Sequence, residues 1–141
     1  MLKSLSFPAK RELLPQMLEQ IMEIIKQYFK DDKWINRLKV CSEEILVNII
    51  DYSNSETLSV TCEFLEEENA LRFEFVDSGT PYNPLEAPPE VDVDAEMDDR
   101  AIGGLGIFLY TNIMDKVEYK YENGKNHLIT IKKCLTGDDE D

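Results

Sequence analysis

The sequence has no long hydrophobic run, few basic residues, three cysteines and a single histidine. No apolar stretch approaches the roughly 20 residues that a membrane-spanning helix needs, and the first residues have no signal-peptide pattern. Lys and Arg number 15 against 29 Asp and Glu, which gives a net charge of −14. A surface this acidic repels nucleic-acid phosphates, so we expect neither a membrane nor a nucleic-acid partner. The charge either keeps the protein soluble or favours a protein partner with a basic face.

The three cysteines exclude a disulfide framework. Cys41, Cys62 and Cys134 are odd in number, widely spaced and set in apolar patterns, which also makes a zinc site improbable. A reducing cytoplasm is the expected location. The only histidine, His127, falls in a predicted strand, and we interpret it as structural rather than catalytic.

Length and composition predict one soluble domain. The chain has 141 residues, of which 43% are hydrophobic and 31% charged, enough to bury a proper core. We assign residues 1–136 to a single domain. The remaining residues, 137–141, are mostly acidic and are expected to form a disordered tail.

Periodicity predicts the order β-α-α-β-β-lid-α-β-β. Residues 2–7 are expected to form a strand, and helical spacing marks helices over about 11–29 and from an N-cap at Asp32 to Tyr52. Alternation predicts strands over 58–64 and 71–75, and Asn123-Gly124 predicts a hairpin between 116–122 and 127–134. Residues 80–101 are acidic and proline-rich, typical of a functional lid or of disorder, and residues 105–114 are expected to be helical. The order implies an α/β (α+β) two-layer sandwich with helices on one face of a mainly antiparallel mixed sheet.

The second predicted helix contains an acid and an amide that could take part in metal binding and proton transfer. Glu44 and Asn48 are four residues apart and share one helix face. The Asn48 oxygen suits Mg²⁺, which binds together with substrate phosphates, and Glu44 could activate a hydroxyl or a water. Alone, the segment fits a solvated helix face better.

Asp77-Ser-Gly79 follows an apolar strand. A carboxylate at a strand end can accept a hydrogen bond from an adenine amino group, and glycine allows the backbone to approach a base. Alone, these residues fit an ordinary exit from a strand into a turn better.

Gly103-Gly-Leu-Gly106 precedes a predicted helix. Glycines at a helix N-terminus expose backbone N–H groups that can cradle a phosphate, although the same residues also suit a flexible hinge. Arg100 is the only cation among the lid's many carboxylates and is the natural candidate to contact phosphates.

Together, the three segments resemble the Bergerat-type ATP-binding fold, and most closely the small anti-sigma-factor serine kinases of the RsbW type, over roughly residues 5–134. Glu44 and Asn48 match the family's Ser-Glu-x-x-x-Asn pattern. Asp77, Gly79 and Pro81 match its Asp-x-Gly-x-Pro pattern, and Gly104 and Gly106 match its Gly-x-Gly lid hinge.

The resemblance implies ATP and Mg²⁺ as cofactors. It assigns Glu44 as catalytic base and Asn48 as metal ligand. The residues expected to bind the nucleotide are Asn48, Asp77, Gly79, Arg100, Gly103, Gly104, Leu105 and Gly106.

The resemblance also implies partners: a sigma factor, an anti-anti-sigma (STAS-type) protein that accepts phosphate on a serine, and a second copy in a homodimer. Two departures favour an alternative, a nucleotide-dependent binding switch without catalysis. Asp51 stands where many family members have histidine, and the lid is unusually acidic and expected to be mobile without ligand. A slow ATPase without a protein acceptor is a third hypothesis.

Overall fold

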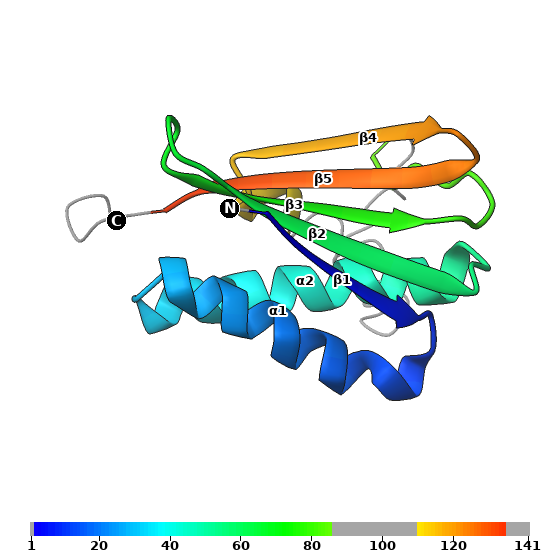
Figure 1. Cartoon of the computed structure of the whole chain (residues 1–141), viewed down its shortest axis with the longest axis horizontal. Helices are drawn as coiled ribbons and strands as arrows, with labels where there is room; N and C mark the ends of the chain where they lie inside the picture. The colour runs from blue at the N-terminus through cyan, green and yellow to red at the C-terminus, as the bar shows by residue number, and fades with distance from the viewer. Residues whose placement is uncertain (1, 86–109, 135–141) are drawn as a thin grey trace, which may run out of the picture.

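A computed structural model describes residues 2–85 and 110–134, which form a five-stranded sheet with helices on one face (Figure 1). The strand order is β1-β2-β3-β5-β4, and every pairing is antiparallel. The predicted two-layer α/β sandwich is confirmed, while the described strands contain no parallel pair. The elements are β1 (Leu2–Pro8), η1 (Arg11–Leu13), α1 (Leu14–Tyr28), α2 (Asp32–Tyr52), β2 (Thr57–Leu65), β3 (Ala70–Asp77), β4 (Lys116–Glu122) and β5 (Lys125–Lys133).

Alternation along β3 separates the two faces of the sheet. Leu71, Phe73 and Phe75 are buried, whereas Arg72 and Glu74 are only partly buried. Because successive side chains of a strand point to opposite faces, the first set packs toward the helices and the second lies on the open face. The helices contribute the other half of the core through Met17, Leu18, Ile21, Met22, Ile24, Ile25, Leu38, Cys41, Ile45, Leu46 and Ile49.

Helix α2 begins one residue earlier than the sequence predicted. Asp31, not Asp32, is the N-cap, and its Oδ1 accepts a hydrogen bond from the Lys33 N–H at 2.8 Å. Asp32 lies in the first turn, where a negative charge is favoured by the helix dipole. At the other end, the Ser53 hydroxyl donates to the Ile49 carbonyl at 2.7 Å, and Asn54 adopts a left-handed backbone (φ 58°) that terminates the helix.

The predicted Asn-Gly hairpin is confirmed. Asn123 and Gly124 have φ values of 56° and 74°, and Glu122 pairs directly with Lys125. A two-residue loop with both residues at positive φ matches the twist of the flanking strands. The strand after the turn therefore starts at Lys125, two residues before the predicted start.

Trp34, the single tryptophan, fastens the start of α2 to the sheet. The Arg37 guanidinium lies 4.6 Å from the ring centroid and the Lys132 ammonium of β5 lies 4.2 Å from it. Both contacts are within the range of cation–π attraction. Lys132 also lies 3.7 Å from a carboxylate oxygen of Asp115, so its buried charge is compensated.

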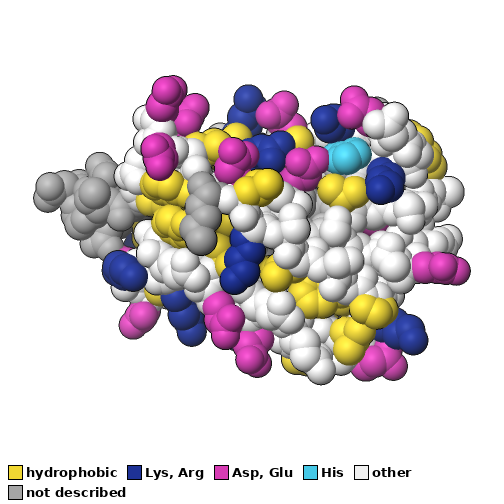
Figure 2. Space-filling view, viewed as in Figure 1, with side chains coloured by type: hydrophobic (Ala, Val, Ile, Leu, Met, Phe, Trp, Pro, Cys, Tyr) yellow, Lys and Arg dark blue, Asp and Glu magenta, His cyan; other side chains and the backbone are white. Residues whose placement is uncertain are grey.

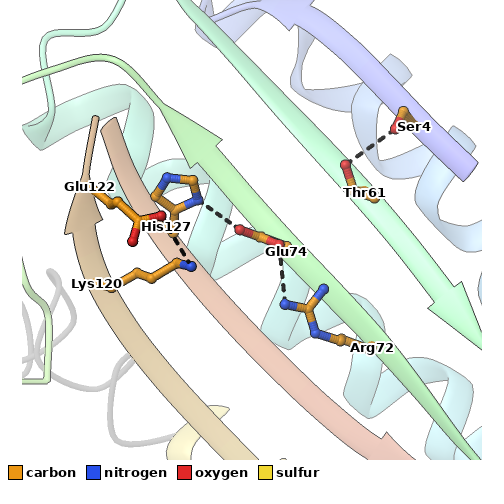
Figure 3. Close-up of polar contacts among 7 residues, drawn as sticks. All are labelled: Ser4, Thr61, Arg72, Glu74, Lys120, Glu122 and His127. Carbon is orange, nitrogen blue, oxygen red and sulfur yellow. Dashed lines mark hydrogen bonds and ion pairs between the residues drawn. The ribbon is translucent and has the colours of Figure 1, made fainter. Parts of the chain in front are cut away.

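The open face of the sheet carries charged pairs in place of a second helix layer (Figure 3). The His127 Nδ1 and a Glu74 carboxylate oxygen are 2.7 Å apart, and Arg72 lies 3.2 Å from the other oxygen. Burial alone would raise the pKa of Glu74, but the hydrogen bond with His127 and the Arg72 charge outweigh it and lower that pKa. The structural interpretation of His127 fits this ladder.

Acidic and basic side chains are interspersed over the face seen in Figure 2.

All three cysteines are buried and free, in agreement with the expected absence of disulfides. Burial, with a smaller effect of Glu44, raises the pKa of Cys41 to about 12, so this thiol stays protonated. Within residues 2–85 and 110–134, no helix is long and apolar enough to cross a membrane, and no cluster of potential metal ligands is found in these ranges.

Candidate functional site

Asp77 ends β3 on the helix-facing side and is only 5% exposed. Its Oδ1 accepts hydrogen bonds from the Gly79 N–H and from the Asn126 side-chain amide, both at 2.9 Å. Neither bond uses Oδ2, and no described residue donates to it. Asp77 therefore presents one fixed carboxylate with one oxygen available to a ligand.

Asn126 of β5 is the cross-strand partner of Asp77. Its Nδ2 also donates to the Thr80 carbonyl at 2.8 Å. Its Oδ1 accepts from the Tyr82 N–H at 3.0 Å and from the Tyr119 hydroxyl of β4. This buried amide ties together two strands and the turn that follows β3.

Gly79 lies where the turn passes the end of α2. A Cβ at this position would come within 1.8 Å of the Ser53 carbonyl oxygen, so no larger residue fits without backbone movement. The same carbonyl accepts from the Thr80 N–H at 2.8 Å and from its hydroxyl at 3.1 Å. The glycine is needed for close approach of two backbones, which differs from the predicted approach to a base.

The opposite wall contains polar atoms without partners. Asn48 is 5% exposed and Tyr110 is fully buried, yet neither the Asn48 Nδ2 nor the Tyr110 hydroxyl has a hydrogen-bond partner among the described residues. Burial, and then Tyr82, raise the pKa of Tyr110, while the Asn48 side chain lowers it. The Asn48 side chain and the Tyr110 hydroxyl are therefore close neighbours. Buried polar groups are normally satisfied, so this pair marks an incomplete site.

Glu44 lies one turn before Asn48 on α2 and is half-buried. Burial, followed by the charge of Glu43, raises the pKa of its carboxyl. A raised pKa makes a carboxylate a better proton acceptor. The alternative of a simply solvated helix face does not fit Asn48, which is buried.

Asp77, Asn48, Tyr110 and Asn126 line one pocket between α2 and the sheet. Its free volume is about 20 Å³, which is space for about one water molecule. A nucleotide base can enter only if some lining side chains shift. Tyr82 is one such side chain, and its ring stacks on that of Tyr52 with centroids 5.7 Å apart. The complete lining is Ile45, Asn48, Ile49, Ser53, Phe75, Asp77, Tyr82, Pro84, Tyr110, Tyr119, Asn126 and Leu128.

Asp51 does not extend this pocket. Its carboxylate lies 3.0 Å from the guanidinium of Arg11 in η1, so the negative charge of Asp51 is paired with a positive one. The departure from the family pattern at this position therefore adds less negative charge to the site than expected.

The structure brings together Asn48 and Asp77 as pocket residues and places Glu44 one helical turn away. Five predicted site residues lie outside the described residues: Arg100, Gly103, Gly104, Leu105 and Gly106. Sequence reasoning missed Asn126, Tyr110, Tyr82 and Tyr119. The Asn-Gly turn was a usable signal for Asn126, because it sets the hairpin register two residues before it.

The pocket presents polar groups of the kind that bind a nucleotide, and it has to widen to admit a base. It offers a carboxylate oxygen for an amino group and a buried amide whose Nδ2 has no partner among the described residues, and the Asn48 side-chain oxygen is of the kind that Mg²⁺ prefers. A family model described as "Histidine kinase-like ATPase domain" matches residues 7–132. The chain belongs to this family of ATPase domains.

Two curated relatives are similar to this chain over most of its length. The chain is 30% identical over 135 residues to the "Serine-protein kinase RsbW" of Listeria monocytogenes, covering 90% of this chain and 84% of the relative. It is 27% identical over 142 residues to the RsbW of Halalkalibacterium halodurans, covering 97% and 85%.

The solved structures show the same fold. The histidine kinase AdeS of Acinetobacter baumannii matches with a TM-score of 0.57 at 11% identity, over 96% of this chain and 70% of that one. The catalytic domain of the histidine kinase ThkA, in a nucleotide-free form, matches with a TM-score of 0.54 at 16% identity, over 94% and 97%. The resemblance stated from the motifs is confirmed at the level of family and fold.

Proposed function

We propose that this protein is an ATP-binding serine-protein kinase that acts as an anti-sigma regulatory factor. The observation that carries the proposal is the pocket in which a buried strand-end carboxylate, Asp77, and an orphaned buried amide, Asn48, lie on facing walls. The similarity to the RsbW kinases supports a protein serine as the phosphate acceptor.

Each residue has a distinct task in this proposal. The free oxygen of Asp77 accepts a hydrogen bond from the adenine amino group, and Asn48 offers its oxygen to Mg²⁺. The metal, when bound, neutralises charge on the phosphates. Glu44 takes the proton of the serine hydroxyl as the serine oxygen bonds to the γ-phosphorus. The bond from that phosphorus to the β,γ-bridging oxygen breaks, and ADP leaves.

The phosphate-contacting residues and the partners belong to the same proposal. Arg100 and the glycine-rich segment 103–106 would contact the phosphates, by resemblance to the family. A sigma factor, an anti-anti-sigma protein of the STAS type and a second copy of this chain are the partners it implies. The cytoplasm is the location in which these partners meet.

Binding is tested by calorimetric titration of ATP with Mg²⁺ into wild type and Asp77→Asn. We expect saturable binding to wild type and at least a hundredfold weaker binding to the variant, because an amide donor would face the adenine amino group. Asp51→Asn is the matched control, since that carboxylate pairs with Arg11 at the surface, and it should bind normally. No wild-type binding at millimolar nucleotide would refute the proposal.

Phosphoryl transfer is tested with γ-labelled ATP and a STAS-type protein from the same organism. Glu44→Gln should lower the rate roughly 10²–10⁴-fold, the usual contribution of a general base, with nucleotide affinity nearly unchanged. Asp51→Asn, whose carboxylate pairs with Arg11 at the surface, serves as control here too. If wild type binds ATP but transfers no phosphate, the alternative of a non-catalytic nucleotide-dependent switch is favoured, as is a slow ATPase if free phosphate accumulates.

A further inference from the structure

Asn126 uses the whole hydrogen-bonding capacity of its side chain within the protein. A primary amide has two N–H donors and an oxygen with two lone pairs. The Asn126 Nδ2 donates to Asp77 and to the Thr80 carbonyl, and its Oδ1 accepts from the Tyr82 N–H and from the Tyr119 hydroxyl. The residue is only 5% exposed. With four bonds made, it has no donor or acceptor left for a ligand, so any effect on binding passes through the groups it holds.

The groups it holds belong to three parts of the pocket. Asp77 ends β3, Thr80 and Tyr82 lie in the turn that follows, and Tyr119 comes from the edge strand β4. Since the Asn126 amide and the Gly79 N–H both reach Oδ1 of Asp77 at 2.9 Å, rotation of the carboxylate would break one or both bonds. Oδ2 is thereby kept in one orientation.

We propose that Asn126 is a positioning residue for base recognition, fixing the Asp77 carboxylate and the adjoining turn so that Oδ2 meets the exocyclic amino group of a purine. This inference rests on the proposed nucleotide site and adds to it the residue that sets selectivity for that amino group. Asn126 does not touch the nucleotide. It acts through Asp77.

The test compares two ligands, ATP and purine riboside triphosphate, which lacks the exocyclic amino group. The measured quantity is the ratio of their dissociation constants by calorimetry, with Mg²⁺ present. In wild type we expect ATP to bind about tenfold more tightly or better, the value of one well-placed hydrogen bond to a charged group.

Asn126→Asp keeps the side-chain volume and removes both donors. The ratio should fall below about twofold, because a second carboxylate next to Asp77 turns its oxygens away from the base. A residue with only a structural role would weaken both ligands equally and leave the ratio at its wild-type value, which would overturn the inference.

Tyr119→Phe provides a second test if Asn126→Asp does not fold. It removes one of the four bonds to Asn126, and the ratio should fall about two- to threefold. Tyr121→Phe, on the same strand with a side chain 44% exposed, should leave the ratio unchanged.

The outcomes separate the inference from the proposed function. Wild type that binds no nucleotide overturns both. Wild type that binds both ligands equally overturns this inference and the contact assigned to Asp77, while ATP binding itself stands. Wild type that discriminates while the folded variants discriminate equally well overturns the role of Asn126 alone.

Discussion

The two walls of the pocket differ in how completely their polar groups are paired. On the sheet wall, the Asn126 side chain is fully paired and Oδ1 of Asp77 accepts two hydrogen bonds, while Oδ2 of Asp77 has no donor among the described residues. On the helix wall, the Asn48 Nδ2 and the Tyr110 hydroxyl are buried and have no hydrogen-bond partner within residues 2–85 and 110–134. Leaving such a group unpaired costs about 1–3 kcal/mol, so each wall keeps polar atoms that a ligand can pair, one on the sheet wall and two on the helix wall. The sheet wall is therefore held by more internal hydrogen bonds than the helix wall.

The largest loss of stability is expected from a substitution at Gly79, in the turn that passes the end of α2. Gly79→Ala places a Cβ within 1.8 Å of the Ser53 carbonyl, which forces the turn away from α2. We expect a loss of about 3 kcal/mol in the free energy of unfolding, measured by urea denaturation.

Gly124→Ala is the matched control for that variant. No atom lies within 4 Å of the added Cβ, but the φ of 74° is unfavourable for alanine, and the loss should be about 1 kcal/mol. Equal losses at the two glycines would mean that the close approach at Gly79 is not a constraint.

Removing the hydroxyl from Tyr110 or from Tyr119 should change the free energy of unfolding differently. Tyr110→Phe removes a buried hydroxyl with no partner, so the free energy of unfolding should stay unchanged or rise by up to about 1 kcal/mol. Tyr119→Phe removes a hydroxyl that donates to Asn126 and should lower it by about 1 kcal/mol. Thermal and urea unfolding of both variants measure the difference, and a loss of stability in both would show that the Tyr110 hydroxyl is paired in solution.

The smallest effects concern two glutamates whose pKa values move in opposite directions. The pKa of Glu74 is lowered by His127 and Arg72 despite burial, so its stabilisation is present above the unfolded pKa and is lost as pH falls through the folded value. The pKa of Glu44 is raised by burial and by Glu43, so its ionised form destabilises the fold at neutral pH, and this cost disappears as pH falls through the raised pKa.

These directions are tested by unfolding the two glutamine variants between pH 3 and 8. Relative to wild type, Glu74→Gln should be less stable at pH 7 and converge with wild type in acid. Glu44→Gln should be slightly more stable at pH 7 and lose that advantage in acid. The same sign for both at pH 7 would contradict the opposite directions of the two pKa shifts.

Local patterns in the sequence predicted most of the elements, because they depend on residues near one another. The stripes of α1 and α2, the alternation of β2 and β3 and the Asn123-Gly124 turn all appear where expected. Helix ends were less certain: Asp31 and Asp32 are both good capping residues, and only the backbone conformation selects the first.

The candidate site was predicted only in part, since its completion depends on strand order. Asp77 and Asn48 were found by motif, but Asn126 pairs with Asp77 because β5, and not β4, lies next to β3. No local pattern sets that order. Tyr110 was missed for a similar reason, because its burial beside Asn48 depends on how its segment packs against α2.

The cation–π contacts of Trp34, the chain's one tryptophan, make its fluorescence a probe of how α2 packs on the sheet. Its indole contacts both Arg37 and Lys132 at the start of α2, while Asn48 lies on the same helix roughly 20 Å further along its axis at about 1.5 Å per residue. Its emission should therefore follow the detachment of α2 from the sheet on unfolding and remain nearly constant when a ligand binds near Asp77. A change of emission on adding nucleotide would report movement of the whole helix.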